Sequence, residues 1–138
     1  MSKRRSVTAI ISVGGMLLLL ALAYGIDSWR EYTDRYYQET FSHGFEIHLS
    51  YVIANLLLAG AIVLWLWFVF VRVDLDKWVY AVFVCTGLLI SIYPIIYFTD
   101  LGVLYVAYRL SPAFQIYLTS GIIAMAGVLK LITMQKKP

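Results

Sequence analysis

Two histidines, His43 and His48, stand on either side of Glu46 and are the residues best suited to bind a metal ion or a haem group. On a continuous helix they would lie about 140° apart around the axis, so they would not share a face unless a turn between them brought them together. A metal ion would need a further ligand from Glu39 or Asp100, and a haem would need the imidazoles on facing helices. The sequence therefore predicts no metal and no cofactor.

A polar stripe on the second hydrophobic segment is the best candidate for ligand binding. His48, Tyr51, Asn55 and Ala59 follow one another at spacings of three, four and four residues, so they share one helix face. A buried asparagine in lipid usually hydrogen-bonds a neighbouring helix, with a contribution of about 0.6–2 kcal/mol. The expected partners from the third and fourth segments are Tyr93, Tyr97, Gln115 and Thr119. The same stripe could instead form the polar end of a pocket for the head group of a lipid, quinone or isoprenoid.

Small residues form a seam on the last hydrophobic segment, where Ser120, Ala124 and Gly127 are spaced by four and three residues. Small side chains on one face let two helix backbones approach closely. The seam predicts either packing within the chain or a docking face for another subunit. Cys85 is the single cysteine, which excludes a disulfide within the chain, and we expect it to be a buried structural residue.

Motifs that carry catalysis are missing from the sequence. It contains no nucleophile elbow, no phosphate-binding loop, no zinc-protease motif, no CxxC and no pair of catalytic carboxylates. The central parts of the hydrophobic segments also lack ionisable residues, which argues against a proton-coupled transporter acting as a monomer. The sequence therefore favours a protein that is not an enzyme.

The composition places these residues in a membrane. Hydrophobic residues make up 62% of the 138 residues and charged residues only 14%, with a mean hydropathy of +0.80. Soluble domains are near 45–50% apolar and about a quarter charged, so a soluble enzyme and a nucleic-acid-binding module are excluded. Charge-free runs cover residues 6–26, 49–71, 78–99 and 110–129. Each is long enough to cross about 30 Å of hydrocarbon, which predicts an all-α bundle of four transmembrane helices forming a single domain over residues 1–138.

The distribution of charge predicts the orientation of these four spans. The side with both termini and the 72–77 loop has eight basic and two acidic residues, and the other side has three basic and six acidic residues. Basic residues gather on the cytoplasmic side of membrane proteins, so both termini should be cytoplasmic, where anionic lipid would contribute to their binding. The first run is longer than the apolar part of a signal peptide, so we expect it to remain as a span.

Two connections complete the expected topology. Residues 27–48 form a long outer loop in which Trp29, Tyr32 and Tyr36 recur at helical spacing. This period predicts that the first helix continues beyond the membrane, or that a separate helix lies flat at the interface. The six residues 72–77 predict a tight antiparallel hairpin of the second and third helices.

Three functions are compatible with this pattern. The favoured one is a non-catalytic accessory or scaffold subunit of a larger complex in the plasma membrane, since the chain is small and its spans lack charge. The second is a homo-oligomeric channel or membrane effector, although residues 56–68 offer no polar lining. The third is an outer-leaflet protein or enzyme that binds a lipid or quinone near His48, Asn55 and Tyr93. The expected partners are other membrane subunits, further copies of the chain and lipids, and no nucleic acid.

Overall fold

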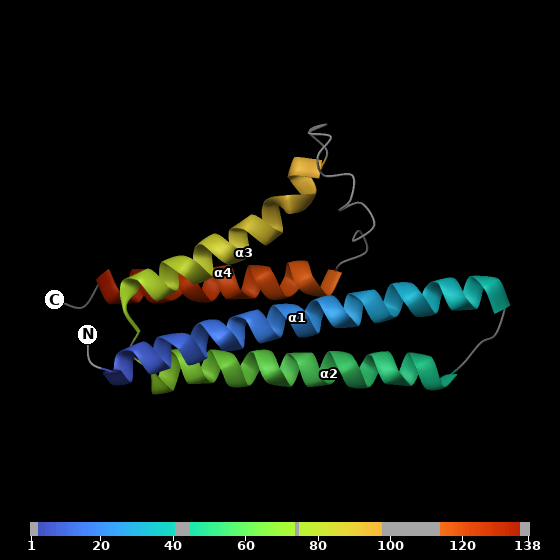
Figure 1. The fold of residues 1–138 in the computed structure, drawn as a ribbon, viewed down its shortest axis with the longest axis horizontal. Helices are drawn as coiled ribbons and strands as arrows, with labels where there is room; N and C mark the ends of the chain where they lie inside the picture. The colour runs from blue at the N-terminus through green and yellow to red at the C-terminus, as the bar shows by residue number, and fades with distance from the viewer. Residues whose placement is uncertain (1–2, 41–44, 74, 98–113, 136–138) are drawn as a thin grey trace.

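The computed structural model is entirely helical over the residues that it describes, which are 3–40, 45–73, 75–97 and 114–135 (Figure 1). Side chains are described for residues 5–36, 39, 49–73, 75–92 and 115–135. The elements are α1 (Lys3–Thr40), α2 (Phe45–Trp67), a π-helical turn η1 (Phe68–Arg72), α3 (Lys77–Tyr97) and α4 (Phe114–Gln135). No strand occurs in these ranges. The predicted all-α class is confirmed.

Three of the helices are long and apolar enough to cross a membrane. The apolar stretches cover Arg5–Tyr36, Leu49–Arg72 and Gln115–Gln135. In α3 the stretch with described side chains, Lys77–Ile92, is apolar but shorter. The prediction of transmembrane helices is confirmed for these three, and the fourth span remains a prediction.

The first helix is much longer than its hydrophobic run. Its 38 residues reach about 57 Å at 1.5 Å per residue, so it extends well beyond an apolar layer of about 30 Å. Residues 27–40 therefore continue the first helix, as the first of the two alternatives for this segment expected, and the placement of this part outside the membrane remains a prediction. The reason is local, because residues 27–40 contain neither glycine nor proline. Ion pairs one turn apart, Arg30 with Asp34 and Arg35 with Glu31, add to the stability of this part.

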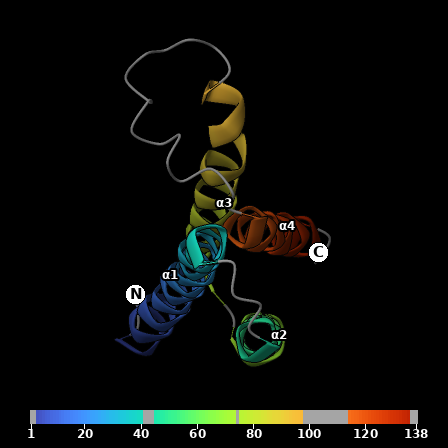
Figure 2. The same ribbon diagram turned by 90° about the vertical axis from the view of Figure 1, so that its right-hand side faces the viewer.

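The helices are arranged around α1 rather than as sequential hairpins. Helix α1 packs against α2 and α4 and, to a lesser extent, against α3, whereas α3 packs mainly against α4. Helices α2 and α3 lie on opposite sides of α1 and α4 (Figure 2) and do not pack along each other, so the predicted tight hairpin of these two helices was wrong. The chain turns between them through η1 and through Val73, which has an extended backbone with φ −128° and ψ 130°. Small residues then favour packing of α3 on α4, as described below.

An indole group fixes the contact between α1 and α2. The Nε1–H group of Trp65 donates a hydrogen bond of 3.0 Å to the carbonyl oxygen of Ser12. A Cβ atom at Gly15 would lie 2.8 Å from Cδ1 of Trp65, so the indole fits only because Gly15 has no side chain. The same ring meets Phe83 of α3 at 5.1 Å between centroids, and Trp65 therefore joins three helices in the core.

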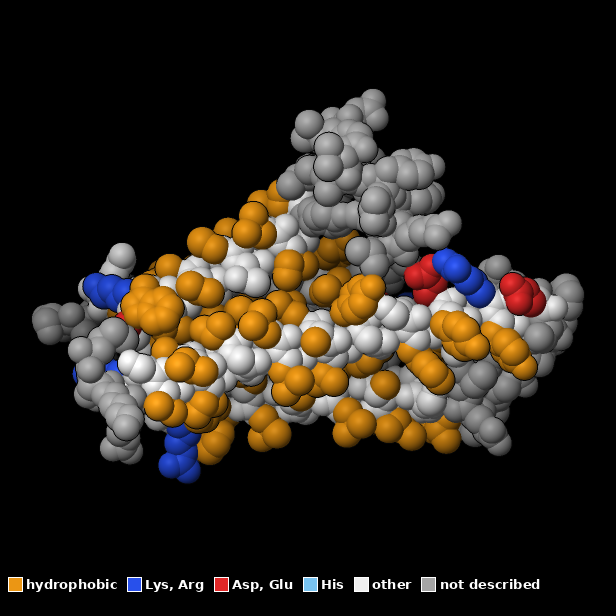
Figure 3. All heavy atoms as spheres, viewed as in Figure 1, with side chains coloured by type: hydrophobic (Ala, Val, Ile, Leu, Met, Phe, Trp, Pro, Cys, Tyr) orange, Lys and Arg blue, Asp and Glu red, His pale blue; other side chains and the backbone are white. Residues whose placement is uncertain are grey.

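On the face shown in Figure 3, the surface is apolar in the middle and charged at both ends. One end, which we call the basic end, has Arg5, Arg72, Lys77 and Lys130. The other end, which we call the acidic end, includes the charged residues of α1 after position 30. Cys85 is exposed on α3, so the expectation of a buried cysteine was wrong. Its position on the helix turns it away from α4, where the small-residue contact is made.

Candidate functional site

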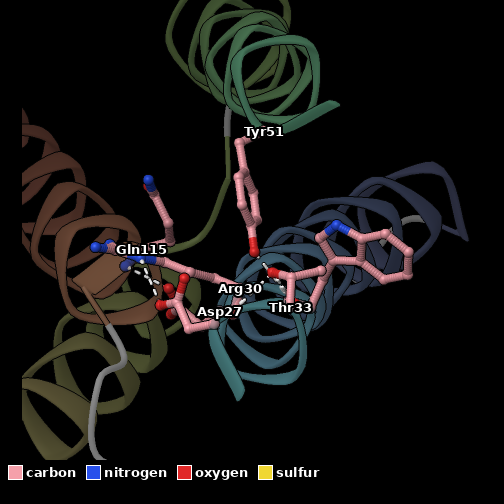
Figure 4. Close-up of polar contacts among 7 residues, drawn as sticks. Asp27, Arg30, Thr33, Tyr51 and Gln115 are labelled. Carbon is pink, nitrogen blue, oxygen red and sulfur yellow. Dashed lines mark hydrogen bonds and ion pairs between the residues drawn. The ribbon is translucent and has the colours of Figure 1, made fainter. Parts of the chain in front are cut away.

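A buried carboxylate lies between α1 and α4. Asp27 is only 5% exposed, and its two carboxylate oxygens accept hydrogen bonds from the backbone N–H groups of Gln115, at 3.1 Å, and Ile116, at 3.0 Å (Figure 4). The first N–H groups of a helix have no partner inside it and carry partial positive charge. Asp27 therefore caps the first turn of α4 from a helix that is distant in sequence.

This carboxylate corrects the sequence analysis in one respect. Asp27 was expected at the start of the outer loop, directly after the charge-free run 6–26. In the structure it belongs to α1 and is buried. The sequence could not reveal this, because its partners follow 88 and 89 residues later. The signal in retrospect is an acidic residue at the end of a long apolar run, opposite the first turn of another apolar helix.

Gln115 also connects α4 to α2. Its Nε2 amide group donates a hydrogen bond of 2.7 Å to Oδ1 of Asn55. Of the four partners expected for Asn55, the structure thus selects Gln115. Thr119 is buried on the same helix and makes no bond to Asn55, and its hydroxyl has no hydrogen-bond partner among the described residues. The side chains of His48, Tyr93 and Tyr97 lie outside the described residues, as do His43 and Asp100.

The polar stripe of α2 reaches two different helices. The hydroxyl group of Tyr51 donates a hydrogen bond of 3.3 Å to the carbonyl oxygen of Trp29 on α1, close to Thr33 in Figure 4. Asn55, one turn further along, bonds α4 instead. We call Asp27, Tyr51, Asn55 and Gln115 the polar layer. It joins α1, α2 and α4 at one level toward the acidic end.

The carboxylate and the two amide side chains of the polar layer are engaged in hydrogen bonds within the protein. General acid or base catalysis requires a titratable group that can reach a substrate. Here the only carboxylate in the layer accepts two backbone N–H groups, and the two amide side chains bond each other. Within the described part of the chain, no three His, Cys, Asp or Glu residues are close enough to hold a metal ion.

The small-residue seam packs within the chain. Gly127 faces α3, where an added Cβ atom would lie 2.8 Å from both the carbonyl oxygen of Tyr80 and Cγ2 of Val84. On the other side of the contact, a Cβ atom at Gly87 would lie 2.5 Å from the carbonyl oxygen of Ser120. The hydroxyl groups of Ser91 and Ser120 are hydrogen-bonded at 3.0 Å. Two roles were expected for Ser120, Ala124 and Gly127, namely packing within the chain or docking of another subunit. The structure shows the first, because this face of α4 contacts α3.

A groove between α2 and α4 was not foreseen from the sequence. It has a volume of about 730 Å³ and is lined by apolar side chains and Tyr117. Trp67 of α2 and Phe70 of η1 form one wall, and Gly121 and Leu129 of α4 form the other. It arises because α2 packs on α1 and meets α4 mainly through the Asn55–Gln115 hydrogen bond. Such a groove depends on helix packing, which the hydrophobic periodicity of single segments does not encode.

A second cavity of about 460 Å³ lies at the basic end and is lined by charged and apolar side chains. Arg5, Lys77 and Lys130 line it together with Asp76, and Arg5 pairs with Asp76 at 3.9 Å.

Compared with known protein families, with curated proteins and with solved structures, the chain matches none of them.

Proposed function

We propose that the protein is a four-span protein of the plasma membrane, with both termini in the cytoplasm, that acts as a non-catalytic accessory or scaffold subunit of a larger membrane complex. The fourth span in this proposal is α3, whose 21 residues would reach about 31 Å. The basic end would face the cytoplasm, because basic residues accumulate on that side.

The observation that carries this proposal is the contrast between the polar layer and the outer surfaces. The polar groups of Asp27, Asn55 and Gln115 form hydrogen bonds between helices, and the carboxylate of Asp27 is held by two backbone N–H groups. Large apolar side chains on three helices are meanwhile uncovered, among them Ile10 on α1, Leu64 on α2 and Leu89 on α3, each about two-thirds exposed or more. Inside a membrane such faces meet lipid or another protein.

The two other functions have less support. A channel between copies would need polar groups along an exposed face, and the groove between α2 and α4 is lined by apolar residues except Tyr117. An outer-leaflet site for a quinone would need Asn55 available for its head group, and this side chain already bonds Gln115.

Site-specific photo-crosslinking in the native membrane tests the proposal. A photoreactive amino acid is placed at Ile10, Leu64 or Leu89, and at buried Phe83 as a control. An accessory subunit gives one discrete crosslinked membrane protein from one face, none from Phe83, and the same partner in stoichiometric amount after extraction in mild detergent. Crosslinks to the chain itself would support an oligomer instead. Lipid adducts from all three faces would contradict a subunit role.

A further inference from the structure

The groove between α2 and α4 has the length of one membrane leaflet. Along α4 its lining extends from Tyr117 to Leu129, which is about 18 Å at 1.5 Å per residue. Half of a hydrocarbon core of about 30 Å is about 15 Å. The groove ends at the basic end, beside Phe70 of η1. An acyl chain that enters from the leaflet at this end therefore fits its length and its apolar walls.

Two cations stand at this end of the groove. The guanidinium carbon of Arg72 lies 5.0 Å from the centre of the Trp67 ring, and Nζ of Lys130 lies 5.0 Å from the centre of the Phe70 ring. Both rings belong to the groove wall. Nζ of Lys130 also donates a hydrogen bond of 3.1 Å to the carbonyl oxygen of Phe70, which directs it toward η1. Cation and ring contacts of this kind hold a charge beside an apolar surface.

These cations are not neutralised by acidic groups in the described part of the chain. The ion pairs found there are Arg5 with Asp76, Arg30 with Asp34 and Arg35 with Glu31, and none involves Arg72 or Lys130. None of the described residues that line the groove is acidic, and Asp76, which lines the neighbouring cavity together with Lys130, pairs with Arg5. The end of the groove is therefore complementary to an anion that is attached to a hydrocarbon chain.

We infer that the groove between α2 and α4 binds an anionic phospholipid, with an acyl chain along Gly121 and Leu129 and the phosphate at Arg72 and Lys130. A quinone matches this site less well, because its head group is uncharged and gains nothing from two cations. The inference rests on the placement of the helices in a membrane, and it does not require the role as an accessory subunit.

Gly121 allows the groove to be closed without disturbing the core. A Cβ atom added there meets no atom within 4 Å, although the residue lines the groove. Gly121→Phe therefore fills the space that the acyl chain would occupy. Gly60 on α2 is a matched control, since a Cβ atom there also meets nothing within 4 Å and the residue does not line the groove.

The test is a lipid titration of the purified, delipidated full chain, read by native mass spectrometry. Dioleoyl phosphatidylglycerol is compared with dioleoyl phosphatidylcholine, which has the same acyl chains and no net charge. We expect phosphatidylglycerol to bind about tenfold more tightly. The double substitution Arg72→Gln and Lys130→Gln should remove this preference, whereas Arg35→Gln at the acidic end should keep it. Gly121→Phe should weaken binding of both lipids, and Gly60→Phe should not.

Helical content measured by circular dichroism verifies that each variant is folded. Equal binding of the two lipids to the unmodified chain would overturn the inference. So would an unchanged preference in the double variant, or unchanged binding in Gly121→Phe. The two kinds of variant act on different elements of the site, so misfolding of one leaves the other decisive. Failure here would leave the crosslinking test of the accessory role unaffected, because the titration uses the isolated chain.

Discussion

Asp27 illustrates how a charged residue can serve packing inside an apolar helix layer. Burying a carboxylate is costly unless it is hydrogen-bonded, and the free N–H groups of Gln115 and Ile116 supply both the bonds and a favourable partial charge. In return, the first turn of α4 is fixed against α1. An ionisable residue in a membrane helix is by default a candidate for transport or proton transfer. Here the geometry assigns it to helix capping.

The first prediction concerns this cap. Asp27→Ala should lower the free energy of unfolding by about 1–3 kcal/mol, because two buried N–H groups lose their acceptor. Asp27→Asn should cost less, since its amide oxygen still accepts one bond. Asp34→Ala, at an exposed ion pair 3.8 Å from Arg30, should change stability by less than about 1 kcal/mol. The measurement is denaturation in mixed micelles followed by circular dichroism. Equal stability of Asp27→Ala and the unmodified protein would remove the capping role.

The second prediction concerns the bond between Asn55 and Gln115. A double-mutant cycle with Asn55→Leu and Gln115→Leu should give a coupling of about 1 kcal/mol, the size found for hydrogen bonds between membrane helices. Each single change should cost at most about 2 kcal/mol, because lipid accepts leucine readily. If Asn55 instead contacts a ligand, Asn55→Leu should leave stability intact and abolish co-purified lipid or quinone. Zero coupling together with unchanged ligand content would contradict both interpretations.

At the scale of the elements, α3 and α4 depend on two glycines for their close contact. Gly127 faces Tyr80 and Val84 of α3, and Gly87 faces Ser120 of α4. The third prediction is that Gly127→Ile destabilises the isolated chain by about 1–3 kcal/mol, the usual cost of overpacking, while membrane insertion is retained. Leu129, which is 49% exposed, serves as the control, and Leu129→Ile should be nearly silent. A silent Gly127→Ile in thermal unfolding would mean that the seam faces lipid.

Some of these elements follow from the sequence, and others do not. Long charge-free runs predicted helices near the observed ones, because runs of this length satisfy their backbone only as helices in lipid. The sequence did not decide whether the first helix continues to Thr40 or a separate helix lies flat at the interface. Charged residues are interleaved with the aromatic residues in this segment, which is compatible with both. Asn55 was recognised as a contact between helices, and Gln115 was among its expected partners. The capping role of Asp27 and the groove were not predicted, because both depend on which helices pack together. The small-residue seam did not decide this, since it was compatible with packing within the chain and with docking of another subunit.

At the scale of the whole molecule, α1 is the central helix. A bundle of sequential hairpins would have no helix in this position. It packs on α2 and α4, while α3 packs mainly on α4 (Figure 2). The result is an open set of helices with apolar faces between them and two ends of different charge. The basic end holds Arg5, Arg72, Lys77 and Lys130, and the described charged side chains of α1 beyond Asp27 are Arg30, Glu31, Asp34, Arg35 and Glu39. A membrane placed across the apolar middle would separate these two groups.

The last prediction tests this placement. Single cysteines at Lys77, which begins α3, and at Asp34, on the outer part of α1, should react with a membrane-impermeant maleimide from opposite sides of sealed vesicles. The background contains Cys85→Ala, so that each introduced cysteine is the single thiol of the protein. Thr133→Cys, near the end of α4, should label from the same side as Lys77→Cys, since both lie at the basic end. Labelling of Lys77→Cys and Asp34→Cys from one side would mean that the apolar middle does not span the bilayer. Labelling of Lys77→Cys and Thr133→Cys from opposite sides would mean that α3 and α4 do not cross it together.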